Sequence, residues 1–273
     1  MDIRDIMRSV TGLVDNEIPL FETALSISLI EFPGLKIEEE LERLNSLIIG
    51  AKNRIKGLET QELVFRSVNK YFFNDVAFKG NRTDYYDPKN SCLSIVLDTA
   101  VGIPITLSVL YLSIVRAVGL NAFGIGFPGN FLIGVQINDK TRIINCFENG
   151  NELSSDDLQK LLDVIYDGKL ALTSHHLHPI SHRLILVRML NNLKQIYVSK
   201  VEYPKALIVL DCICILFPFS AEDQRDRGKI LVNLGRYDEA AETLKNFLRL
   251  APDSFERAEV ENILAHLNGF NQL

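Results

Sequence analysis

The feature that most constrains the fold is a long stretch without a charged residue, positions 99–115. From 105 to 118 the apolar side chains fall on every side of a helix, and a helix that is apolar all round is buried all round. Pro104 suits the first turn of this helix, and Gly119 suits its end. The stretch contains glycine, proline and serine and reaches only the lower limit for crossing a bilayer. We therefore expect a buried core helix and no membrane-spanning segment.

Helical patterns also precede the core helix. Residues 20–30 and 37–55 carry apolar positions at helical spacing, and Thr60 is suited to cap a third helix. A polar loop over 79–91 follows, and a short helix is expected to begin at Cys92. The first third of the chain is therefore predicted to be helical.

Three short strands are predicted after the core helix, over 122–127, 131–137 and 142–147. Turn residues such as Pro-Gly and Asn-Gly separate them. Neighbouring strands with short loops favour an antiparallel meander, packed here on the core helix. Ser154 or Ser155 is expected to cap the next helix.

The last third contains a repeat. Segments 202–220 and 236–254 match at a spacing of 34 residues, and each has a tyrosine near its start, a small alanine and a closing proline. A repeat of this length and pattern is typical of tetratricopeptide helix pairs. We expect two such repeats, followed by a capping helix over 255–268.

Composition excludes several classes of protein. The chain has 273 residues, 47% of them hydrophobic and 23% charged, with a net charge of −6. No run of Lys and Arg suggests a nucleic-acid partner. The four cysteines show no C-x-x-C spacing, and the charged start lacks the apolar segment of a signal peptide. These observations predict a globular protein of the cytoplasm.

Three segments carry a resemblance to a known family. They are DPKNSCLSIVLDTAVGIPITLSVLYLSIVRAVGL, GFPGNFLIGV and RIINCFENGNEL. Together they resemble the bacterial SirB-type proteins, in which a transglutaminase-like core precedes C-terminal tetratricopeptide repeats. The resemblance covers roughly residues 20–270 and implies an α+β fold.

The same resemblance indicates where transglutaminase chemistry would reside. The wider family pattern assigns its Cys, His and Asp to the positions that hold Pro104, Asn130 and Asn145 in this chain. All five histidines lie beyond residue 174. Without an imidazole to accept the thiol proton, the usual Cys–His mechanism is not available in the front half. The resemblance therefore implies a protein that is not an enzyme.

Our hypothesis is a non-catalytic module that binds a protein or peptide and needs no cofactor. One candidate surface is the groove that a transglutaminase uses for its substrate. The other is the concave face of the repeats. The residues expected at the groove are Pro104, Thr106, Phe127, Asn130 and Asn145.

Two alternatives stay open. Cys92, near a helix start, could be the nucleophile of a thiol hydrolase or acyltransferase, with a histidine recruited from 175–182. The histidines of that segment could instead bind a metal, although Pro179 prevents a continuous helix through them. We favour a buried structural cysteine and a polar connector that binds no metal.

The predicted architecture is α+β: N-terminal helices, a degenerate transglutaminase-like (papain-like) core with a small antiparallel sheet, and C-terminal helical hairpins. The expected boundaries are 1–78 for the N-terminal helical region, 79–168 for the core, 169–182 for a connector and 183–273 for the repeats with their capping helix.

Overall fold

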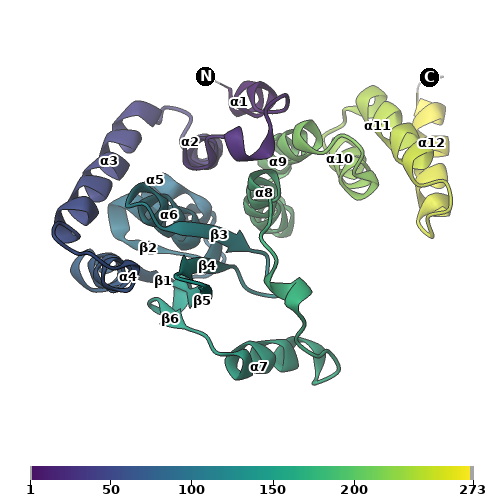
Figure 1. The fold of residues 1–273 in the computed structure, drawn as a ribbon. Helices are drawn as coiled ribbons and strands as arrows, with labels where there is room; N and C mark the ends of the chain where they lie inside the picture. The colour runs from purple at the N-terminus through teal and green to yellow at the C-terminus, as the bar shows by residue number, and fades with distance from the viewer. Residues whose placement is uncertain (1, 271–273) are drawn as a thin grey trace. The chain divides into compact units, whose positions relative to one another are not determined.

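A computed structural model describes residues 2–270 of the chain (Figure 1). The chain forms two compact units. One consists of residues 14–189, and the other of residues 1–13 together with 190–273. The boundary at residue 190 falls within α8 (His182–Ser199), and each unit is described by itself below.

The front unit is built around α6 (Pro104–Ala117), the predicted core helix. Pro104 is its first residue and Gly119, at φ +91°, lies just beyond its end. The side chains on all its faces are buried, which confirms the reading of the uncharged stretch. Its neighbours in the unit are α2 (Leu20–Ser26), α3 (Ile37–Arg54) and α5 (Leu93–Thr99).

The other helical segments of the front unit connect these elements. The predicted helix over 20–30 ends as the 3-10 turn Ile27–Ile30. Thr60 caps α4 (Gln61–Lys70) as expected, because its hydroxyl accepts a hydrogen bond from the Leu63 amide at 3.3 Å. A π-helical turn, Tyr71–Asp75, follows α4 directly.

The predicted meander is present as a four-stranded antiparallel sheet in the order β3-β4-β5-β6. The additional strand β6 consists of two residues, too few for a periodic pattern. A second small sheet pairs β1 with β2 in parallel. The strands are β1 (Lys79–Gly80), β2 (Val101–Gly102), β3 (Asn121–Ile125), β4 (Leu132–Ile137), β5 (Lys140–Asn145) and β6 (Asn151–Glu152).

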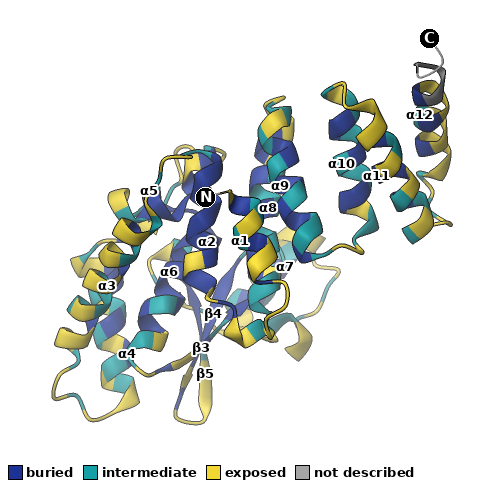
Figure 2. Cartoon of the chain, turned by 90° about the horizontal axis from the view of Figure 1, so that it is seen from above, coloured by how far each residue is buried: buried dark blue, intermediate teal, exposed yellow. Residues whose placement is uncertain are grey.

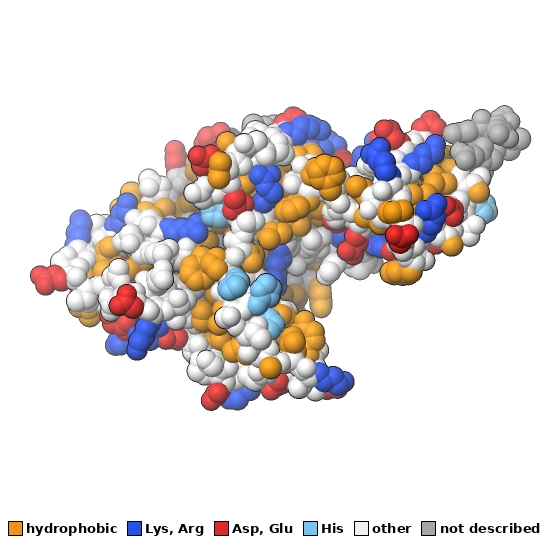
Figure 3. All heavy atoms as spheres, turned by 45° about the vertical axis from the view of Figure 1, so that its right-hand side comes forward, with side chains coloured by type: hydrophobic (Ala, Val, Ile, Leu, Met, Phe, Trp, Pro, Cys, Tyr) orange, Lys and Arg blue, Asp and Glu red, His pale blue; other side chains and the backbone are white. Residues whose placement is uncertain are grey.

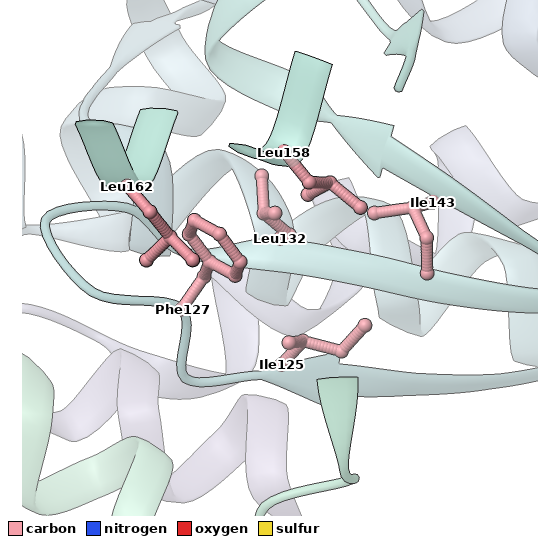
Figure 4. Packing of buried hydrophobic residues seen from close by; sticks show 6 residues of the cluster. All are labelled: Ile125, Phe127, Leu132, Ile143, Leu158 and Leu162. Atoms are coloured by element: carbon pink, nitrogen blue, oxygen red, sulfur yellow. The ribbon is translucent and has the colours of Figure 1, made fainter. Parts of the chain in front are cut away.

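The sheet packs on both α6 and α7 (Ser155–Tyr166). Strands β3 and β4 contact α6, and their residues are largely buried (Figure 2). Ser154 caps α7, and two leucines of that helix reach a cluster of strand and loop side chains (Figure 4). This cluster consists of Ile125, Phe127, Leu132, Ile143, Leu158 and Leu162.

The second unit contains the predicted repeats. Helices α9 (Tyr203–Leu216) and α11 (Tyr237–Leu250) begin and end at positions 34 residues apart, as the sequence pattern indicates. Between them lies α10 (Ala221–Asn233), and α12 (Arg257–Phe270) packs on α11 as the capping helix.

The first helix of the chain, α1 (Ile3–Ser9), packs on α9 and thus belongs to the repeat unit rather than to the helices that follow it. Ile3, Met7 and Val10 are buried and form one apolar stripe. The Asp2 side chain caps the helix by accepting a hydrogen bond from the Arg4 amide at 2.8 Å. This stripe is the sequence signal for the packing of α1.

Candidate functional site

Three segments of the transglutaminase pattern meet at Ser108, one turn after Pro104 in α6. The Ser108 hydroxyl donates to the Phe131 carbonyl at 3.4 Å, next to Asn130 in the chain. The same hydroxyl lies against the thiol of Cys146. The structure therefore brings the start of α6, the start of β4 and the end of β5 to one place.

At the three positions assigned to Cys, His and Asp, each residue present supports the backbone. Pro104 is buried and forms the first turn of α6. Asn145 is buried, and its Oδ1 accepts hydrogen bonds from the amides of Phe147 and Glu148 at 3.1 and 3.4 Å. Asn130 is half-buried, and its backbone N–H donates to the Phe127 carbonyl at 3.1 Å. The last two contacts hold the turns that end β5 and precede β4.

The other two groove residues are also buried. Thr106 is fully buried, and its hydroxyl accepts from the Ile103 amide at 3.1 Å and donates to the Asn90 carbonyl at 3.0 Å. Phe127 has no exposed surface and belongs to the cluster shown in Figure 4. Four of the five predicted groove residues therefore lie inside the fold, and only Asn130 reaches the surface in part.

The cysteines of the front unit are buried as well. Cys146 is fully buried, and this burial raises its pKa to about 12. Cys92 is fully buried at the start of α5, where its thiol contacts the Pro88 carbonyl at 3.7 Å. A thiolate nucleophile needs a depressed pKa and an accessible sulfur. The burial of both residues opposes such a role.

The histidines of the connector lie on the surface or at its edge. A group of histidine side chains is visible among hydrophobic ones in Figure 3. The rings of His175 and His178 lie 5.3 Å apart, and the Nδ1 of His176 accepts from the Thr173 amide at 3.0 Å. Over residues 2–270, no three His, Cys, Asp or Glu side chains are grouped closely enough to hold a metal ion.

His182 takes part in the packing of the front unit. Its ring nitrogens contact the Ile18 carbonyl at 3.1 Å and the Arg116 guanidinium at 2.9 Å. Burial, followed by the charge of Arg116, lowers the pKa of this imidazole. His182 is therefore held neutral in a structural position.

Arg188 is a residue of this region that sequence patterns do not indicate. Its guanidinium donates to the carbonyls of Phe127 and Asn130 at 3.1 and 2.5 Å, and it lies over the ring of Phe131. Burial lowers the pKa of this group. The Arg188 side chain thus closes the loop that carries Asn130, although nearly sixty residues separate them in sequence.

The repeat unit offers a more open polar surface. Two cavities of about 580 and 530 Å³ share Gln224 and Arg227 of α10. More cations than acids line them. The cations are Arg4, Arg8, Arg227, Arg236, Lys245 and Arg249, and the acids are Asp2, Asp211, Glu239 and Glu242.

Asp211 ties three helices together at the centre of this surface. It accepts from Arg227 at 2.8 Å and from Arg4 at 3.3 Å, which joins α9 to α10 and α1. Arg227 also donates to the Thr243 hydroxyl of α11 at 2.7 Å. We name the surface formed by the two cavities the repeat groove.

The opposite side of α10 is occupied by ion pairs. Arg225 binds the carboxylate of Glu256, and Lys229 contacts Glu259 of α12 at 2.7 Å. Residues 225 and 229 lie on the other side of the helix from 224 and 227. The repeat groove therefore lies on the side of α10 that faces away from these ion pairs with α12.

No helix among the described residues is long and apolar enough to cross a membrane.

Comparisons with known proteins agree with this architecture. The profile of the transglutaminase-like superfamily matches residues 38–191, and a tetratricopeptide repeat profile matches residues 193–267. The chain thus belongs to the transglutaminase-like superfamily, with tetratricopeptide repeats after the transglutaminase-like domain. Its relatives over nearly the full length are bacterial UPF0162 proteins, and this result confirms the SirB-type resemblance.

Three relatives illustrate the extent of the similarity. A UPF0162 protein of Xylella fastidiosa (strain Temecula1) is 30% identical over 93% of this chain and 90% of that protein. A UPF0162 protein of Vibrio cholerae is 28% identical over 86% of this chain and 87% of that protein. Human F-box only protein 21 is 38% identical over only 31% of this chain and 13% of that protein. No solved structure matches the chain.

Proposed function

We propose that this chain is a non-catalytic module of the cytoplasm that binds a protein or peptide through the repeat groove. The observation that carries the proposal is the pair of cavities that share Gln224 and Arg227. They extend over the sides of several helices, which suits an extended peptide better than a compact small molecule.

The charges of the repeat groove suggest the chemistry of the peptide. Lys245 and Arg249 lie on α11, and within residues 2–270 neither forms an ion pair with an acid of the chain. Arg249 instead hydrogen-bonds to the neutral amide of Asn246. Two exposed cations without an acidic partner favour a ligand that carries carboxylates.

The non-catalytic part of the proposal rests on the front unit. The resemblance assigns the family's reactive residues to the positions of Pro104, Asn130 and Asn145. The alternative, a thiol hydrolase or acyltransferase, requires Cys92 to be exposed to its substrate, whereas Cys92 has no exposed surface. Selective labelling of Cys92 by a thiol reagent at neutral pH would favour the alternative.

A peptide-binding measurement tests the proposal. The probes are two fluorescent peptides of equal length, one rich in Glu and one with Gln in place of each Glu. We expect the Glu-rich peptide to bind more tightly, and we expect its affinity to fall at least tenfold in a K245E/R249E variant. Binding should also weaken as salt is added.

The matched control is K200E, which reverses the charge of another exposed lysine in the same unit. It should leave the affinity unchanged. Equal binding of the two peptides, or equal losses in K245E/R249E and K200E, would contradict the proposal. Capture of a native partner that N130R loses and K245E/R249E retains would move the function to the front unit.

A further inference from the structure

A further cavity, lined by acidic and apolar side chains, lies in the front unit. It has a volume of about 590 Å³, within the range of small-molecule sites. The turn 31–35 forms one wall, α3 contributes Glu40 and Arg43, and α5 contributes Ser94, Ile95 and Asp98. None of these residues belongs to the candidate sites described above.

Two buried polar atoms of residues that line this cavity have no hydrogen-bond partner among the described residues. They are Oε2 of Glu40 and Oγ of Ser94, and their residues are only 8% and 5% exposed. The backbone N–H of Ser94 donates to the Ser28 hydroxyl at 3.5 Å. The side-chain hydroxyl of Ser94 is therefore the group of this residue that lacks a partner. A buried polar group without a partner destabilises the fold. A ligand that bonds to both atoms would recover that free energy.

Arg43 does not satisfy the Glu40 carboxylate. Its Nη1 lies 3.5 Å from Oε2, close enough for an ion pair but without the geometry of a hydrogen bond. The same Nη1 donates to Asp98 at 3.2 Å. Arg43 is thus shared between two acids and directed toward the rim of the cavity.

Charge and shape indicate which ligand would fit. The lining acids Glu40 and Asp98 outnumber the single lining cation, Arg43. The remaining wall is largely apolar and consists of Phe32, Pro33, Leu35 and Ile95. An acidic end and an apolar wall together suit a cation on a hydrocarbon stem.

We propose that this cavity, the Glu40 site, binds an ammonium or guanidinium group carried on an apolar stem. The cationic group donates to Oε2 of Glu40 and to the Ser94 hydroxyl, and the stem lies against Phe32 and Ile95. A free aliphatic diamine and the side chain of a Lys or Arg residue share this chemistry.

The ionisation of Glu40 supports the proposal. Burial raises the pKa of this carboxyl, Arg43 lowers it less, and Asp98 and Glu39 raise it further. Glu31 from the preceding turn adds another negative charge to the same cavity. A bound cation favours the ionised carboxylate, so the affinity should rise with pH as Glu40 loses its proton.

Calorimetric titration with cadaverine tests the Glu40 site. We expect saturable binding to the full chain, a loss of at least tenfold in E40Q, a smaller loss in S94A, and no change in E42Q. Glu42 lies on the same helix and is exposed, so E42Q is the matched control. The affinity of the wild type should increase from pH 5 to pH 8, whereas that of E40Q should not.

Two comparisons complete the experiment. Pentanol, which has the stem without the charge, should bind at least tenfold more weakly than cadaverine. Capped lysine and arginine amides distinguish the sources: tighter binding than cadaverine indicates a partner's side chain, and weaker binding indicates a free amine. Equal affinities in E40Q and E42Q, or equal binding of pentanol and cadaverine, would overturn the proposal. Thermal melts of each variant verify folding, and S94A provides the test if E40Q does not fold.

Discussion

Replacing Phe127 by alanine tests whether this predicted groove residue belongs to the core. A ligand contact at the surface can be truncated at little expense to stability. Phe127 instead has no exposed surface and contacts side chains of the sheet and of α7 (Figure 4). We therefore expect the substitution to act on the free energy of unfolding.

The expected magnitude follows from the burial. Truncation of a fully buried phenylalanine loses its transfer free energy and leaves a cavity, which together destabilise by about 3–5 kcal/mol. With a urea m-value of about 2 kcal/mol per molar, the midpoint should fall by about 2 M. Partial collapse of α7 onto the sheet would place the effect at the lower end of this range.

The suitable assay is urea unfolding monitored through amide hydrogen exchange. Exchange in β4 and β5 reports on the unit that contains Phe127, whereas circular dichroism averages over both units. The control is Tyr86→Ala in the same unit, because Tyr86 is 72% exposed and should change stability by no more than about 0.5 kcal/mol. A Phe127→Ala midpoint equal to that of Tyr86→Ala, with peptide binding lost, would refute the core assignment.

Three further predictions concern other parts of the chain. Gly150→Ala should destabilise the fold by about 2–4 kcal/mol, because Gly150 has φ +76° and an added Cβ would clash with the ring of Phe73. The control is Gly34→Ala, which should be nearly neutral in urea unfolding because an added Cβ at Gly34 meets no atom within 4 Å. Hydrogen bonds from Arg4 lower the pKa of Asp2 from 3.8 to about 2, so its stabilisation of α1 is present above about pH 4 and lost as the pH falls toward 2. Since Asp2 is well exposed, we expect its contribution to the stability of α1 to be below about 1 kcal/mol. The measurement is amide hydrogen exchange of α1 as a function of pH, and the pH dependence should be absent in Asp2→Asn. Cys146 should resist iodoacetamide at pH 8 in the native protein and react in urea, and native labelling would contradict its burial and its pKa of about 12.

The elements that the sequence predicts correctly are those with a strong local signal. The core helix is specified by apolar side chains on all its faces, by Pro104 at its start and by Gly119 beyond its end. The repeats are specified by matched residues, so that α9 and α11 share their boundaries at a spacing of 34. Periodicity and turn chemistry were sufficient in these cases because the local preference and the tertiary environment agree.

The features that the sequence does not indicate depend on long-range contacts. Strand β6 is two residues long and exists because it pairs with β5. Arg188 reaches the loop of Asn130 from a distant helix, and no spacing rule links the two residues. The burial of the unpartnered carboxylate oxygen of Glu40 depends on the packing of α3 against α5, which no local pattern encodes.

Two of the positions that the resemblance assigns to reactive residues, Pro104 and Asn145, are buried and stabilise the transglutaminase-like frame. Asn145 accepts two backbone amides through one neutral oxygen. An ionised aspartate in the same buried position would need a compensating cation, because an unpaired charge in the interior is far more costly than a hydrogen-bonded amide. A proline at position 104 likewise starts α6 without placing a reactive group in the core. Pro104 and Asn145 therefore both have a packing role, which agrees with the proposal that ligands bind at other surfaces.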